Sequence, residues 1–146
     1  MADKQSHINQ WKHNRKFISS IDPEFHDWII TAVFYTAVHA VDTLLAHDKV
    51  TVTDHEARNR ALKLTNRYEQ INLKYEALYG LARTIRYFAN PTKWVAPERI
   101  YKDVVVRYLY PIEASVQKHM GQDLGLGDVK LKVGTKSGAG SSSTPT

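Results

Sequence analysis

The sequence predicts an all-α fold: an up-and-down bundle of about five helices, followed by a flexible C-terminal tail. Only Gly80, of the seven glycines in the chain, precedes position 121. Apolar residues recur at helical spacing in that part of the chain, and the segment Phe25–His47 is apolar or small on nearly every side. A helix of this kind must be enclosed by other helices or by lipid. We therefore divide the chain into a helical domain at 1–120 and a Gly/Ser-rich tail at 121–146.

Composition limits the classes of function. The absence of cysteine excludes a disulfide scaffold, thiol catalysis and cysteine-based metal sites. The net charge of +5 permits an anionic partner such as RNA without requiring one. The N-terminal sequence MADKQSHINQ is too polar for a signal peptide, and Asp42 makes lipid a costly environment for the central helix. We expect a cytoplasmic protein that does not enter a membrane.

Local start signals place the first three helices. The first is expected over Lys4–Ser20, with a basic face that is either simply solvated or contacts phosphate. Asp22–Pro23 supplies an N-cap and a first helical residue, so the second helix should begin there and continue through the central segment. Thr53 and Glu56 have the spacing of a capping box, which predicts the start of the third helix.

Two further helices complete the predicted bundle. The fourth is expected over about 68–89, and the fifth begins at Pro97–Glu98. Pro111 lacks an N–H group and must kink the fifth helix or split it in two. Apolar spacing predicts the inner line of this helix: Ile100, Val104, Tyr108, Ile112 and Val116.

A narrow polar stripe runs along the central helix. At about 100° per residue, its four members fall within roughly 80° of one another. They are Thr31, Tyr35, His39 and Asp42. The stripe is either an internal hydrogen-bond network, or the lining of a site or of a self-association seam. We expect Tyr35, His39 and Asp42 to support a functional site or to lie in an interface.

The start of the third helix is the best anion-binding point in the chain. His55 and Arg58 are three residues apart and share a helix face. Asn59 lies next to them, and Arg60 is on the neighbouring side. The positive end of the helix dipole adds to the charge of the two arginines. A second basic line follows the fourth helix, where Tyr79, Arg83 and Arg86 recur at helical spacing.

This second line has two interpretations. The arginines either lie over aromatic rings at the bundle surface, or form with the tyrosine an RNA-binding strip that stacks against bases and neutralises phosphates.

Familiar metal and cofactor motifs are missing. No two of the seven histidines are three or four residues apart, and neither HExxH nor paired Glu-x-x-His occurs, so the sequence predicts no metal site. P-loop, GxGxxG and GxSxG motifs are absent too, and no cofactor is expected. What remains is histidine and arginine chemistry. Metal-free RNA cleavage needs a base for the 2′-hydroxyl group and a cation beside the developing phosphorane charge.

Three segments together resemble a known family: FHDWIITAVFYTAVHAVDTLLAH, DHEARNRAL and LARTIRYF. Over roughly Ile8 to His119, the chain is similar to bacterial HEPN (higher eukaryote and prokaryote nucleotide-binding) domain proteins. The resemblance implies a compact helical bundle that forms a homodimer, with the active cleft at the dimer interface. It also implies a metal-independent endoribonuclease of a toxin–antitoxin or phage-defence system, with a nucleotidyltransferase-type antitoxin as partner.

The active-site signature of that family is only half present. It consists of an arginine, usually followed by a polar residue, with a histidine about two helical turns further on. Arg58 and Asn59 match its first part. Lys-Leu-Thr at 63–65 occupies the positions of the histidine, and His55 precedes the arginine instead.

Two functions remain open. In an endoribonuclease, His55 acts as general acid and base, Arg58 and Arg60 stabilise phosphate charge, and Asn59 orients the substrate. In a two-fold dimer, His55 of one subunit can meet Arg58 of the partner subunit. In a non-catalytic module, the same residues and the basic line of the fourth helix bind RNA or a nucleotide, or the central helix mediates dimerisation.

Overall fold

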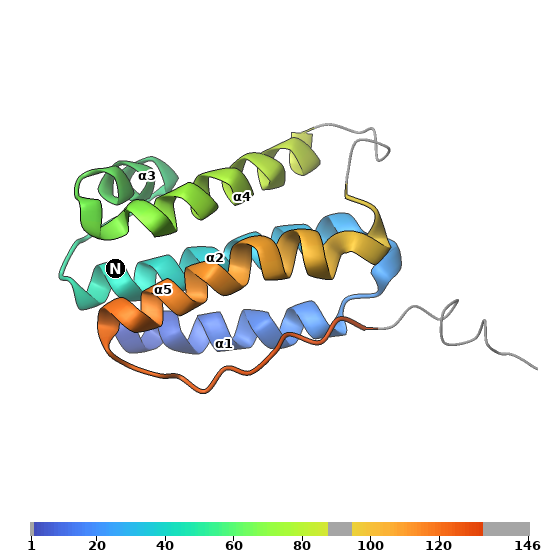
Figure 1. The fold of residues 1–146 in the computed structure, drawn as a ribbon, viewed down its shortest axis with the longest axis horizontal. Helices are drawn as coiled ribbons and strands as arrows, with labels where there is room; N and C mark the ends of the chain where they lie inside the picture. Colours follow the sequence, from blue (N-terminus) through green and yellow to red (C-terminus); the bar gives the residue numbers. More distant parts are fainter. Residues whose placement is uncertain (1, 88–94, 133–146) are drawn as a thin grey trace, which may run out of the picture.

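The computed structural model describes residues 2–87 and 95–132 of the 146-residue chain. It confirms the predicted all-α bundle: every regular element within these residues is a helix, and the long helices run up and down beside one another (Figure 1). The five α-helices are α1 (Lys4–Ser20), α2 (His26–His47), α3 (His55–Lys63), α4 (Glu69–Tyr87) and α5 (Tyr110–Met120).

Helix α2 forms the centre of the bundle, and α1, α4 and α5 all pack against it. Its start follows the prediction, because Asp22 accepts a hydrogen bond from the Glu24 amide at 2.9 Å and a 3₁₀ turn at Pro23–Phe25 leads into the helix. The segment Pro23–His47 is long and apolar enough to span a membrane, but 78% of its most apolar window is buried inside the bundle. Neighbouring helices therefore supply the enclosure that its apolar surface requires.

Helix α3 begins one residue later than the predicted capping box. Asp54, not Thr53, is the N-cap, and its carboxylate accepts a hydrogen bond from the Ala57 amide at 2.7 Å. An aspartate caps as well as a threonine does, and its negative charge also favours the positive end of the helix dipole. Glu56 is consequently free to pair with Arg60 one turn further along the helix.

Helix α4 follows the prediction closely. A 3₁₀ turn at Asn66–Tyr68 precedes it, and its expected end near residue 89 lies outside the described residues. The apolar line that faces α2 is buried throughout: Ile71, Tyr75, Leu78, Ala82 and Ile85.

The last helical segment changes its winding instead of breaking at its proline. After a 3₁₀ turn at Pro97–Arg99, residues 101–109 form a π-helical stretch that joins α5 directly, and Pro111 lies in the first turn of α5. The wider π turns move the buried line onto Val105 and Leu109, while Tyr108 is only half-buried. Tyr108, predicted on the inner line, packs against the core but lies at its edge.

Residues 121–132, which we name the C-terminal strap, pack along the bundle rather than extending from it (Figure 1). Val129 is only 3% exposed, and its amide donates to the hydroxyl oxygen of Tyr110 at 2.8 Å. The Leu124 amide donates to Gln117 Oε1 at 2.7 Å. The flexible tail was predicted to begin at residue 121, and this start is wrong. Residues 133–146 lie outside the described part of the chain.

A buried ion pair links α1, α5 and the strap. The Arg15 guanidinium pairs with the Glu113 carboxylate and also donates to the backbone oxygens of Leu126 and Gly127. Trp11 Nε1 donates to the same carboxylate at 2.7 Å. Burial raises the pKa of Glu113, and the Arg15 and Trp11 hydrogen bonds oppose that rise. Arg15 therefore serves the fold, although it lies on the helix predicted to present a basic face.

Candidate anion-binding site

A buried ion pair joins the polar stripe of α2 to the start of α3. Arg58 Nε lies 2.7 Å from Asp42 Oδ1, and Arg58 Nη2 lies 2.9 Å from Asp42 Oδ2. Arg58 is 7% exposed and Asp42 is 4% exposed. Burial alone would lower the pKa of Arg58, but the hydrogen bonds to Asp42 raise it above its ordinary value. The guanidinium is therefore charged and fixed in one orientation by a two-point contact.

This fixed guanidinium holds His55. Arg58 Nη1 lies 3.0 Å from His55 Nδ1. A guanidinium only donates, so Nδ1 must be the acceptor, and the neutral imidazole then carries its hydrogen on Nε2. Burial, followed by the charges of Arg58 and Arg86, lowers the pKa of His55 from its ordinary value of 6.5. His55 is consequently neutral at pH 7 and presents an N–H donor rather than a bare nitrogen.

Aromatic rings surround this histidine. The ring centroids of Phe34, Tyr35 and Tyr79 lie 5.8, 6.2 and 5.9 Å from that of His55. Tyr75 stacks against Tyr79 on the inner side, and burial raises the pKa of Tyr75 to about 12. That phenol keeps its proton at neutral pH, so the rings form an uncharged wall around the imidazole.

The predicted basic line of α4 adjoins this wall. Arg86 Cζ lies 5.9 Å from the centre of the Phe34 ring, the same ring that contacts His55, and Arg86 Nη1 donates to Tyr35 Oη at 3.4 Å. Arg83 Cζ lies 5.8 Å from the centre of the Tyr79 ring. Both arginines are exposed, and neither forms an ion pair within the described residues. Their charge is available to an anion at the surface.

Two residues of the predicted site are placed differently. The Arg60 side chain, 65% exposed, pairs with Glu56 at 2.9 Å and takes no part in the contacts around His55. Asn59 is half-buried, and its Oδ1 atom has no hydrogen-bond partner within the described residues. The structure therefore brings together His55 and Arg58 of the predicted four, and joins them to Asp42, Tyr35, Tyr79 and Arg86.

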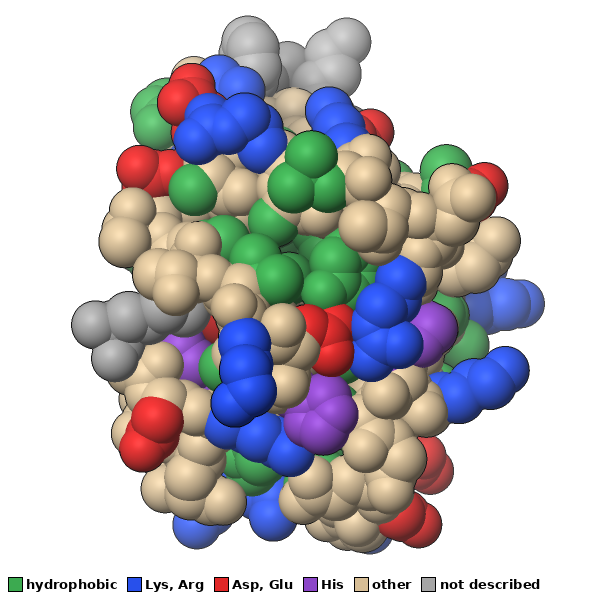
Figure 2. Space-filling model, turned by 90° about the vertical axis from the view of Figure 1, so that its left-hand side faces the viewer, with side chains coloured by type: hydrophobic (Ala, Val, Ile, Leu, Met, Phe, Trp, Pro, Cys, Tyr) green, Lys and Arg blue, Asp and Glu red, His purple; other side chains and the backbone are tan. Residues whose placement is uncertain are grey.

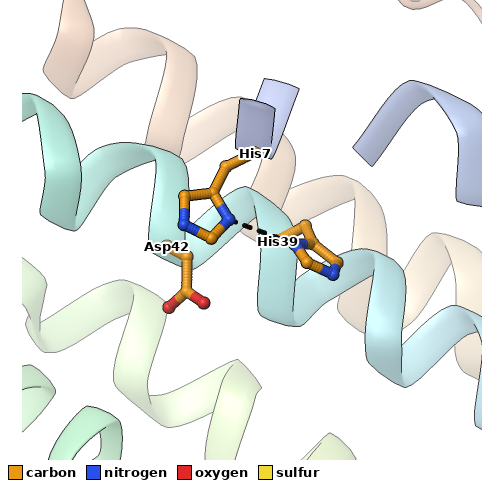
Figure 3. A group of neighbouring side chains, drawn as sticks. All are labelled: His7, His39 and Asp42. Carbon is orange, nitrogen blue, oxygen red and sulfur yellow. Dashed lines mark hydrogen bonds between the residues drawn. The ribbon is translucent and has the colours of Figure 1, made fainter. Parts of the chain in front are cut away.

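The polar stripe of α2 divides between two neighbours. Asp42 faces α3, whereas His39 faces α1, where its Nδ1 atom lies 3.2 Å from Nδ1 of His7 (Figure 3). Thr31 only bonds the carbonyl oxygen of Asp27 one turn earlier. Burial, followed by the charge of His7, lowers the pKa of His39.

His7 was missed by the sequence interpretation. It lies on the buried face of α1, which could be recognised from helical spacing with Trp11 and Ile18. Its partner could not, because helical spacing relates only residues of one helix, and His7 and His39 lie on two. Together with Asp42 they form a group whose ligand atoms all lie within 4.8 Å of one another.

The end of the bundle that carries the loop from α2 to α3 has mixed charge. Figure 2 shows lysine and arginine side chains interspersed with acidic ones around an apolar patch. Arg67 illustrates this mixture, since it binds Asp48 at 2.8 and 3.0 Å. The positive charge there is locally neutralised, unlike that of Arg83 and Arg86.

No protein-family model, curated protein or solved structure matches this chain. The resemblance to HEPN domain proteins therefore stays a prediction from the sequence segments quoted above, and the chemistry of the site rests on its own geometry.

Proposed function

We propose that this chain binds RNA or a nucleotide, without cleaving it, through a phosphate site between His55 and Arg86. The observation that carries the proposal is the hydrogen bond from Arg58 Nη1 to His55 Nδ1 at 3.0 Å. Arg58 is itself fixed by Asp42, so the imidazole is held with its N–H donor available to an acceptor. A phosphate oxygen is the matching acceptor, and charge-assisted hydrogen bonds of this kind are strong.

The net charge around the imidazole favours an anion. Asp42 neutralises Arg58, which leaves the exposed charge of Arg86 next to the Phe34 ring. An entering phosphate would therefore meet one neutral donor and one free cation. Lysine and arginine contacts of this type supply most of the affinity for nucleic-acid backbones and weaken with salt.

The neighbouring surface suits a base. An open cavity of about 360 Å³ is lined by Gly80, Arg83, Thr84 and Tyr87. The Tyr87 ring is exposed and lies 5.8 Å from Arg86 Cζ. Aromatic rings stack on bases of any sequence, which supports a single strand or a nucleotide as ligand rather than a duplex.

Cleavage is the second candidate. The resemblance to HEPN endoribonucleases favours this role for His55, but a neutral imidazole is too weak an acid to protonate a leaving 5′-oxygen, so His55 would have to be an imidazolium when it acts. A general base would still be needed, because Nδ1 of His55 is occupied by Arg58 and Nε2 carries a proton. A homodimer that brings in a partner group is the remaining source of such a base.

Anisotropy of a fluorescent single-stranded RNA, titrated with protein in EDTA, separates these candidates. We expect Arg86→Ala and His55→Ala each to raise Kd by about ten- to a hundredfold, because each removes a phosphate contact worth about 1.5–3 kcal/mol. Arg60→Ala is the matched control, since it removes an equal charge from an exposed side chain outside the site, and it should change Kd less than about twofold.

Two outcomes would reject binding without cleavage. One is equal binding by wild type, Arg86→Ala and Arg60→Ala. The other is RNA that is cut by the wild type in EDTA and stays intact with His55→Ala, which would establish the endoribonuclease instead. Arrested growth of cells that express the wild type, relieved by His55→Ala, would support that same alternative.

A further inference from the structure

The geometry points to a binding site for a divalent transition-metal ion between α1 and α2, formed by His7, His39 and Asp42 (Figure 3). This site shares Asp42 with the candidate anion-binding site, takes its two other ligands from outside it, and does not depend on the proposed function. His7 comes from the second turn of α1, and the other two residues lie three apart on α2. The ion would therefore bridge two consecutive helices, through residues that lie 32 positions apart in the sequence.

The two imidazoles have the separation of ligands on one ion. His7 Nδ1 and His39 Nδ1 lie 3.2 Å apart. Two nitrogens at about 2.0–2.1 Å from a tetrahedral zinc ion are about 3.3 Å apart, which is nearly the same distance. One Nδ1 now carries the proton of the hydrogen bond. On metal binding that proton moves to Nε2 of the same ring, and both Nδ1 lone pairs face the ion.

A second observation concerns the hydrogen bonding of His7. The residue is only 7% exposed, and its Nε2 atom is buried without a hydrogen-bond partner within the described residues. A buried polar nitrogen left in this way destabilises the fold. His7 is therefore a buried imidazole whose one hydrogen bond within the described residues is the contact with His39.

Asp42 can serve as the third ligand while it remains paired with Arg58. A carboxylate has about four lone-pair positions, and Arg58 occupies one on each oxygen. Ligating carboxylates are commonly held by such a hydrogen bond from behind, which orients them. The ligand atoms lie within 4.8 Å of one another, which exceeds a tetrahedral edge, so the ligand side chains must draw closer together as the ion binds.

The donor set selects the kind of ion. Two imidazole nitrogens and one carboxylate suit Zn²⁺ and its neighbours Co²⁺ and Ni²⁺, with water completing the coordination. Mg²⁺ and Ca²⁺ prefer oxygen ligands and would find a single carboxylate here.

Calorimetric titration of the chelator-treated full chain with ZnCl₂ at pH 7.5 tests this site. We expect one ion per chain, and a rise of the melting temperature with Zn²⁺ that MgCl₂ does not produce. His7→Gln and His39→Gln should each weaken Zn²⁺ binding at least tenfold. His13→Gln removes an exposed histidine from the same helix, and it should bind Zn²⁺ as the wild type does.

Two further measurements address the ligands directly. Co²⁺ bound to the wild type should give visible absorption bands that both ligand variants lose. X-ray absorption at the zinc edge of the wild type should show two imidazoles, and it needs no variant to fold. Absence of Zn²⁺ binding, equal affinity of wild type and both ligand variants, or fewer than two imidazoles on the ion would overturn the assignment.

Discussion

At the residue scale, one buried ion pair determines the chemistry of the site. Asp42 takes both ends of the Arg58 fork, and the remaining Nη1 group of Arg58 fixes His55. Without Asp42, the guanidinium would be buried without a counter-charge and free to turn. The ion pair therefore matters for stability, because its loss would leave an unpaired charge buried in the fold. It also fixes the orientation of His55.

Asp42→Asn tests that role. Removing one partner of a buried ion pair costs about 3–5 kcal/mol, so we expect the free energy of unfolding to fall by this amount. Asp103→Asn is the control, because it breaks the exposed Arg99–Asp103 pair on one helical segment and should cost less than about 1 kcal/mol. Urea unfolding followed by circular dichroism measures both. Equal small losses would mean that Arg58 is not held by Asp42.

At the element scale, the C-terminal strap and the π-helical stretch change what the helices alone would form. The strap lies against α1 and α5, where Arg15 holds its backbone and Val129 enters the core. The π-helical stretch directs Val105 and Leu109 toward the core immediately before Pro111. Residues 121–132 are therefore part of the folded domain, which extends at least twelve residues past Met120.

Val129→Ala tests whether the strap stabilises the fold. The Val129 side chain is buried, so its truncation should lower the free energy of unfolding by about 1–2 kcal/mol. Val106→Ala makes the same truncation at a side chain that is 40% exposed, and we expect a loss within about 0.5 kcal/mol. Denaturant titration of both variants gives the comparison. A Val129→Ala protein as stable as the wild type would show that the strap contributes nothing.

At the scale of the whole molecule, the sequence predicted the features that depend on one segment at a time. The extent of α1, the start at Asp22 and the buried line of α4 follow from spacing and capping alone. The contact between His55 and Arg58 was predictable in the same way, because the two residues are three positions apart on one helix. The start of a helix is predicted only to within about one residue where two neighbouring residues, such as Thr53 and Asp54, can each cap it.

Features that join separate helices could not be predicted from spacing. The partner of Asp42 lies 16 residues away, that of His39 lies 32 residues away, and that of Arg15 lies 98 residues away. Each pairing depends on which helices become neighbours, and a periodic pattern does not contain this information. The shift of the inner line away from Tyr108 also depends on the π turns, which the apolar pattern did not show.

The protonation state of His55 tests the central claim most directly. Long-range ¹H–¹⁵N NMR spectra of the full chain, recorded against pH in EDTA, report which imidazole nitrogen carries the hydrogen. We predict a neutral ring with hydrogen on Nε2 at pH 7, a pKa below the ordinary 6.5, and a shift of the Nε2–H signal when single-stranded RNA is added. Hydrogen on Nδ1, a pKa at or above 6.5, or an Nε2 signal indifferent to RNA would contradict the account.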